Sequence, residues 1–135
     1  YLEEGLVGAH GAYTLEYDGF KKIYQYLDRY SKRNDTDIQI VLFTLVEEGK
    51  TYIDLNIVDE TMKAFNRAVV DSLRRVDVGS IYSSNQYILI LMDTATENGD
   101  TVAKRVIEKF QKISPYEGVD VLTEIETMSA MRNQM

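Results

Sequence analysis

The sequence contains no cysteine and only one histidine, His10. Without cysteine the chain has no disulfide and no thiolate ligand for a metal, and a single histidine argues against a zinc site. The absence of cysteine also favours a cytoplasmic location. No apolar run approaches the roughly 20 residues that a membrane-spanning helix requires, and no signal-peptide pattern appears, so we expect no contact with a membrane.

Positive charge is also scarce, because 15 Lys and Arg residues stand against 22 Asp and Glu residues, which gives a net charge of −7. Proteins that bind nucleic acids neutralise phosphates with Lys and Arg. We therefore expect no direct binding of nucleic acid. The hydrophobic fraction of 44% in 135 residues is typical of one globular domain with a real core.

The chain opens with Tyr1-Leu2-Glu3-Glu4 and no Met, so we expect it to be a piece of a longer protein. No repeat, low-complexity tract or linker divides it. We predict a lead-in over residues 1–10, one domain over 11–127 and an unassigned tail over 128–135.

Apolar residues recur at three- and four-residue spacing in three segments, which predicts helices over 16–33, 59–75 and 97–113. Asp59 and Glu60 would lie at the positive end of the second helix. Thr94 and Glu97 form a capping-box pattern before the third. The inward-facing residues would be Tyr17, Phe20, Ile23, Tyr24, Leu27 and Tyr30 in the first helix, Met62, Phe65, Val69 and Leu73 in the second, and Val102, Val106, Phe110 and Ile113 in the third.

Four segments are typical of strands. Residues 38–46 form a continuous apolar run, which indicates a strand buried on both faces. Residues 78–82 and 87–92 predict a hairpin, and 119–127 predict a last strand at an edge. The order predicts an α+β fold, a ferredoxin-like sandwich with a mainly antiparallel sheet flanked by helices.

The segment from Arg74 to Leu91 is the most informative part of the sequence. A helix end, "SLRRVD", is followed by a strand, the turn Ser83-Ser84-Asn85-Gln86-Tyr87, the strand "ILILMDT" and the helix "NGDTVAKRVIEKF". This order resembles the GGDEF domain of diguanylate cyclases, over roughly residues 11–127. The resemblance implies a nucleotidyl-cyclase palm and a role in bacterial signal transduction.

Members of this family join two GTP molecules, and they hold divalent cations on carboxylates beside a glycine-rich hairpin turn. The metal-binding Asp of the first long strand aligns with Thr44. The glycine pair, the two acids and the aromatic residue of the signature align with Ser83, Ser84, Asn85, Gln86 and Tyr87. Hard cations prefer anionic oxygen ligands. The resemblance therefore implies a degenerate signature, with no catalytic residue, metal or other cofactor, so we expect no enzyme activity.

Other acids lie near the end of the first long strand, namely Glu47, Glu48, Asp54 and Asp59. They would have to rebuild a metal site if the domain kept an altered cyclase activity. We favour a solvated acidic loop followed by a helix N-terminus.

Arg74 and Asp77 match the Arg-x-x-Asp motif with which many family members bind the product cyclic di-GMP. Arginine suits phosphate and the guanine Hoogsteen edge. A helix C-terminus that ends on Arg explains the same residues without a ligand. Both interpretations stay open.

Three functions follow as hypotheses. The first is an inactive regulatory or dimerisation module, whose partners are the other domains of a larger signalling protein or transcription regulator, or a second copy. The second is a non-catalytic receptor for cyclic di-GMP or another nucleotide, and the least favoured is a residual cyclase. Tyr26 lies off the apolar stripe of the first helix, which marks it as a candidate contact residue.

Overall fold

A computed structural model of the protein describes residues 13–15, 17–34, 38–72, 78–91 and 99–127. The elements follow one another in the order β1, α2, β2, α3, β3, β4, α4 and β5.

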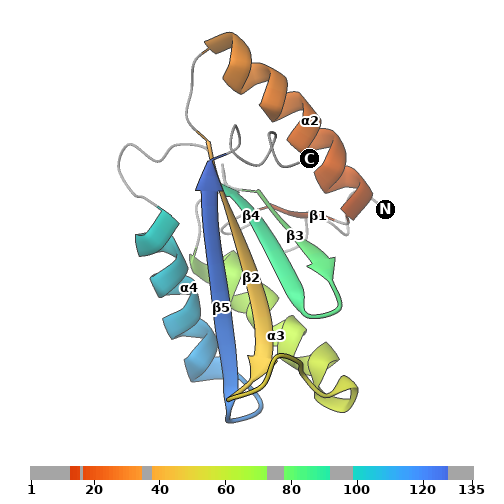
Figure 1. Cartoon of the computed structure of the whole chain (residues 1–135), viewed down its shortest axis with the longest axis vertical. Coiled ribbons are helices and arrows are strands. Elements are labelled where there is room, and N and C mark those ends of the chain that lie inside the picture. The colour runs from red at the N-terminus through yellow and green to blue at the C-terminus, as the bar shows by residue number, and fades with distance from the viewer. Residues whose placement is uncertain (1–12, 16, 35–37, 73–77, 92–98, 128–135) are drawn as a thin grey trace.

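The centre of the fold is a five-stranded sheet with the order β1-β3-β4-β2-β5 (Figure 1). β1 pairs in parallel with β3, and all other neighbours are antiparallel, which confirms the mainly antiparallel sheet. β5 lies at one edge, as predicted. The strands are β1 (Tyr13–Leu15), β2 (Gln39–Glu47), β3 (Val78–Ser83), β4 (Gln86–Leu91) and β5 (Val119–Thr127).

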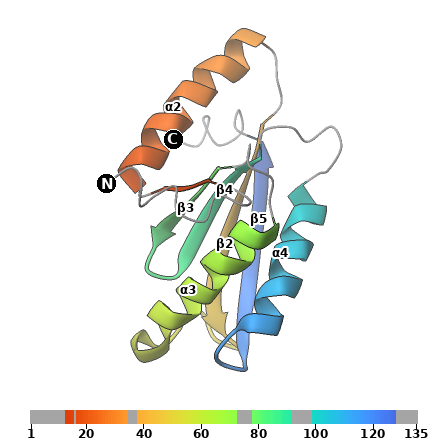
Figure 2. The ribbon, with the colours of Figure 1, turned by 180° about the vertical axis from the view of Figure 1, so that it is seen from behind.

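Three helices flank the sheet, namely α2 (Tyr17–Asn34), α3 (Leu55–Ser72) and α4 (Gly99–Ile113). α3 and α4 pack together over one face, and α2 packs toward the other face near β1 and β3 (Figures 1 and 2). The result is the predicted α+β sandwich.

The larger core lies between the sheet and the α3–α4 layer. Phe65 of α3 is at its centre, with ring centroids 4.9 Å from Phe43, 5.2 Å from Phe110 and 5.7 Å from Tyr87. Alternate residues of β2 and β4 point into this core, because side chains alternate across a strand. They are Val41, Phe43, Leu45, Tyr87, Leu89 and Leu91.

A second, smaller core lies on the opposite face of the sheet. Ile40 of β2 and Ile88 of β4 pack there with Leu27 of α2. β2 is thus buried from both sides, as its continuous apolar run predicted, and the hairpin beside it is anchored in two hydrophobic layers.

The helix boundaries correct two expectations. α3 begins at Leu55 rather than at 59, so Asp59 and Glu60 lie beyond its first turn and not at its positive end. Ile113 and Tyr30 are 38% and 42% exposed, although both were expected to face inward. Ile113 is the last residue of α4, and the C-terminal end of α2 extends past the sheet (Figure 1). Leu73, Thr94 and Glu97 lie outside the described residues.

Candidate functional site

The hairpin between β3 and β4 carries the residues that the family resemblance aligns with the signature. β3 ends at Ser83 and β4 begins at Gln86, so Ser84 and Asn85 form a two-residue turn. The pairing shifts between Ile81 and Ser83, which indicates a bulge at Tyr82. The turn lies beside β2, because the backbone N–H of Leu45 donates to the carbonyl of Asn85 at 2.8 Å.

A neutral hydrogen-bond network joins the hairpin to β2. Gln86 faces Thr44 in the β2–β4 register, and its Nε2 donates to Thr44 Oγ1 at 3.1 Å. Ser83 Oγ lies 2.9 Å from Gln86 Oε1 and 3.3 Å from Asn85 Oδ1, so its single proton favours Gln86. Both ends of the Gln86 amide are therefore occupied within the protein.

Asn85 is also turned inward. Its Nδ2 donates to the Leu45 carbonyl at 3.0 Å, while its own carbonyl accepts from the Leu45 N–H. The structure thus brings Thr44, Ser83, Asn85 and Gln86 together, whereas Ser84 at the tip is exposed. The arrangement forms a neutral polar clamp between β2 and β4.

Tyr87, the aromatic residue of the signature, belongs to the core. It is 1% exposed and packs on Phe65, and its hydroxyl donates to Asn66 Oδ1 at 2.7 Å. Burial raises the pKa of Tyr87 well above its ordinary value, because the phenolate would lose its hydration. Gly79 makes room for this side chain, since a Cβ there would lie 2.9 Å from Tyr87 Cε1.

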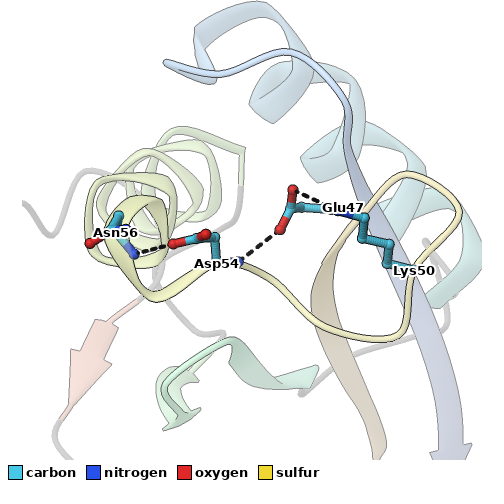
Figure 3. Close-up of polar contacts among 4 residues, drawn as sticks. All are labelled: Glu47, Lys50, Asp54 and Asn56. Carbon is cyan, nitrogen blue, oxygen red and sulfur yellow. Dashed lines mark hydrogen bonds and ion pairs between the residues drawn. The ribbon is translucent and has the colours of Figure 1, made fainter.

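Two of the acids, Glu47 at the end of β2 and Asp54 in the loop after it, form hydrogen bonds that hold this loop and the start of α3 (Figure 3). Glu47 Oε2 accepts from the backbone N–H of Asp54 at 2.9 Å, and Glu47 Oε1 lies 3.7 Å from Lys50 Nζ. Asp54 Oδ1 accepts from the N–H of Asn56 at 2.7 Å, which makes Asp54 the N-cap of α3. The expectation of a solvated loop leading into a helix N-terminus agrees with these bonds.

Glu48 and Asp59 are exposed. Within the described ranges, no three His, Cys, Asp or Glu side chains gather closely enough to hold a metal ion.

The side chains at the signature positions do not fit the divalent cations that the family resemblance implies. Thr44 and Asn85 offer neutral oxygens where a hard cation prefers carboxylates. Thr44 Oγ1 already accepts a hydrogen bond, and the Asn85 amide is directed at Leu45. We therefore assign no metal-dependent step to this hairpin.

Arg74 and Asp77 lie outside the described residues, in the connection between the end of α3 and the start of β3. Two cations of α4 reach the C-terminal end of α3. Arg105 Nε donates to the Ser72 carbonyl at 3.0 Å, and Lys109 Nζ donates to the Asp71 carbonyl at 3.3 Å. No local pattern predicts these contacts, because they depend on the packing of α3 against α4.

α2 presents a second surface, formed by aromatic and basic side chains. Tyr26, Arg29, Tyr30 and Arg33 line a shallow hollow of about 280 Å³ on α2. Tyr26 is 61% exposed, in agreement with its position off the apolar stripe. Among the described helices, none combines the length and hydrophobicity needed to cross a membrane.

Comparison with known proteins gives a fold. No family model matches the sequence, and no curated protein matches it. A DGC protein from Thermotoga maritima superimposes with a TM-score of 0.71 at 12% identity, over 93% of this chain and 92% of that one. The fold is that of diguanylate cyclases.

A second solved structure gives the same result. The diguanylate cyclase SiaD of Pseudomonas aeruginosa, in complex with its activator SiaC, superimposes with a TM-score of 0.67 at 15% identity. The match covers 88% of this chain and 51% of SiaD. The GGDEF-like fold predicted from the hairpin region is thereby supported, while identities this low say nothing about activity.

Proposed function

We propose that this chain is a catalytically inactive GGDEF-like module, which acts as a regulatory or dimerisation unit of a larger bacterial signalling protein or transcription regulator in the cytoplasm. The observation that carries the proposal is the hydrogen bond between Gln86 and Thr44. This hydrogen bond engages the two side chains that stand where the related enzymes need charged ligands for cations.

The physical reason is electrostatic. Condensation of nucleoside triphosphates requires cations that neutralise the phosphates, and those cations require anionic oxygens. Thr44, Asn85 and Gln86 are neutral, and each is held by a partner inside the protein. The hairpin therefore retains the framework of the fold without the charge that the chemistry needs.

A domain of this fold that lacks the catalytic charges can still act through contacts with other proteins. SiaD was solved with an activator protein bound, which supports a role for protein contacts in this fold. We expect the partners of this module to be the other domains of its parent protein or a second copy of the chain.

Product analysis tests the proposal. The purified chain is incubated with GTP or ATP and Mg²⁺ or Mn²⁺, beside a diguanylate cyclase with an intact signature, and nucleotides are separated by chromatography. We expect no cyclic dinucleotide from this chain. Turnover that disappears in Asp54→Ala or Asp59→Ala would instead identify a residual cyclase with altered ligands.

The regulatory role needs a separate measurement. Sedimentation velocity over a range of concentrations reports self-association of the module, and deletion of residues 11–127 from the parent protein reports its effect on the output. A module that stays monomeric and whose deletion changes nothing would contradict the proposal even if no product forms.

A nucleotide receptor is the second candidate, and it rests on Arg74 and Asp77. In the sequence they fall between Ser72, where the described part of α3 ends, and Val78, where β3 begins. Titration calorimetry with cyclic di-GMP on the wild type and on Arg74→Ala distinguishes a nucleotide receptor from a helix C-terminus that binds no ligand. Heat that vanishes in Arg74→Ala supports the receptor, and no heat at high micromolar ligand excludes it.

A further inference from the structure

The outer edge of β5 is open in the part of the chain that the structure describes. β5 is the last strand in the sheet order and pairs with β2 along one side only (Figure 1). It has nine residues and contains neither Pro nor Lys, and its charged residues, Asp120, Glu124 and Glu126, are all acidic. Acidic side chains protect such an edge against strands of like charge, but they leave it as a template for a strand of opposite charge.

The backbone groups that point outward are defined by the ladder. The N–H of Glu48 donates to the Gly118 carbonyl at 2.7 Å, just beyond the pair of Glu47 with Val119. Hydrogen-bonded and non-bonded pairs alternate in an antiparallel ladder. The N–H and C=O groups of Val121, Thr123 and Ile125 therefore point away from β2, toward the open edge.

A groove runs beside this edge. α4 packs over the face of the sheet, where it contacts both β2 and β5. Between α4 and β5 the surface is hollowed by about 370 Å³. The hollow is lined by Asp100, Ala103, Lys104, Ile107, Thr123 and Ile125. An added strand would direct every second side chain into it, and the apolar part of its wall, formed by Ala103, Ile107 and Ile125, suits small aliphatic side chains.

The other face of β5 is acidic. Asp120 and Glu124 are exposed on either side of Leu122, which is itself 54% exposed. Side chains directly opposite on neighbouring strands interact, and opposite charges are favourable there. Antiparallel pairing of two copies of β5 centred on Leu122 would set Asp120 against Glu124. The edge thus disfavours a second copy and favours a basic strand.

We propose that the β5 edge binds an extended, basic segment of a partner protein as a sixth strand. Its aliphatic side chains fill the groove between α4 and β5, and its Lys or Arg side chains face Asp120 and Glu124. The proposal goes beyond the function proposed above, and it stands whether or not the hairpin site is catalytic.

Binding is tested with a fluorescently labelled peptide of alternating lysine and valine, as long as β5. Anisotropy measures its affinity for the full chain, beside a peptide of the same composition with the lysines in one block. We expect the alternating peptide to bind at least about tenfold tighter, because only it can satisfy both faces of the edge. Equal affinity of the two peptides would overturn the proposal.

Two variants locate the site. Thr123→Pro removes an outward N–H while the ladder to β2 keeps its bonds, and Thr123→Val is its matched control. Glu124→Lys reverses one charge, and Asp59→Lys, on α3, is its control. We expect Thr123→Pro and Glu124→Lys each to lose about tenfold in affinity and both controls to bind like the wild type.

Amide hydrogen exchange distinguishes pairing of a sixth strand from binding through charge alone. Peptide binding should slow exchange at Val121, Thr123 and Ile125, whose N–H groups face outward. Protection elsewhere with none at these amides would overturn the proposal. Concentration-dependent protection of the same amides without peptide would also overturn it, because a second copy would then occupy the edge.

Discussion

Tyr87 joins the hairpin to the helical layer at the scale of a single residue. Its ring lies against Phe65 and its hydroxyl donates to Asn66. We predict that Tyr87→Phe lowers the free energy of unfolding by about 1 kcal/mol, because Asn66 loses its donor while the ring contacts persist. Urea denaturation measures the change. Tyr26→Phe, on the exposed surface of α2, should leave the midpoint where it is.

The same tyrosine makes stability depend on alkaline pH. The pKa of Tyr87 is raised in the folded protein by burial, while in the unfolded chain it titrates near its ordinary value of about 10. Above that value the unfolded state loses a proton that the folded state keeps, so stability falls as pH rises. We predict a loss of stability that begins near about pH 10 and grows as the pH rises toward the raised pKa of the folded state, and that is smaller in Tyr87→Phe.

Comparison of the two proteins at each pH isolates this effect. The pKa of Tyr116 is also raised, by its hydrogen bond to Glu60, and this contribution is the same in wild type and variant. Identical alkaline losses in wild type and Tyr87→Phe would show that the buried hydroxyl does not control the transition.

The start of α3 illustrates prediction at the scale of an element. The sequence indicated a helix from 59 with Asp59 and Glu60 at its positive end, whereas Asp54 caps the helix and Leu55 begins it. The apolar periodicity of this helix was read correctly. Its N-terminus was missed because Asp54 acts through a local bond to the N–H of Asn56, which periodicity does not reveal.

A pair of substitutions tests this boundary. Asp54→Ala removes the cap and should lower the free energy of unfolding by about 1 kcal/mol, since an orphan N–H of the first turn loses its acceptor. Asp59 is exposed beyond that turn, so Asp59→Ala should change the free energy of unfolding by less than about 0.5 kcal/mol. Thermal and urea unfolding of both variants measure the difference. If Asp59→Ala were the more destabilising of the two, the helix would begin near residue 59, as the sequence predicted.

For the other elements, the sequence predicts what a local apolar pattern determines and misses what a distant pairing determines. The boundaries of β5 matched its predicted range and those of α2, β2, β3 and β4 came within one residue, because their apolar patterns are local. β1 was not predicted, since Tyr13–Leu15 is too short to show a period and is defined by its pairing with β3. Non-local pairing is what a pattern along the chain cannot display.

At the scale of the whole molecule, the candidate site was predicted in part. The family resemblance named Thr44 and the hairpin residues, and the fold brings them together across β2 and β4. The hydrogen bonds from Gln86 to Thr44 and from Asn85 to Leu45 were not predictable, because they link residues about forty positions apart in geometry that only the folded sheet creates.

A double substitution tests whether charge alone separates this hairpin from a cation site. Thr44→Asp with Gln86→Glu would put two carboxylates at directly paired positions of β2 and β4. Without metal the pair should lower stability by about 1–2 kcal/mol, through mutual repulsion and the lost Gln86 bond. Because adjacent carboxylates are the ligands that divalent cations seek, Mn²⁺ at about ten times its Kd should restore about 1.4 kcal/mol.

The neutral variant Thr44→Asn with Gln86 unchanged keeps the shape of the aspartate without its charge, so Mn²⁺ should leave its melting temperature unaltered, as it should that of the wild type. Thermal melts of the three proteins across a Mn²⁺ titration give the answer. If the wild type were stabilised by Mn²⁺ as strongly as the double variant, the neutral clamp around Thr44 would not be what keeps cations away, and the case for an inactive module would lose its electrostatic basis.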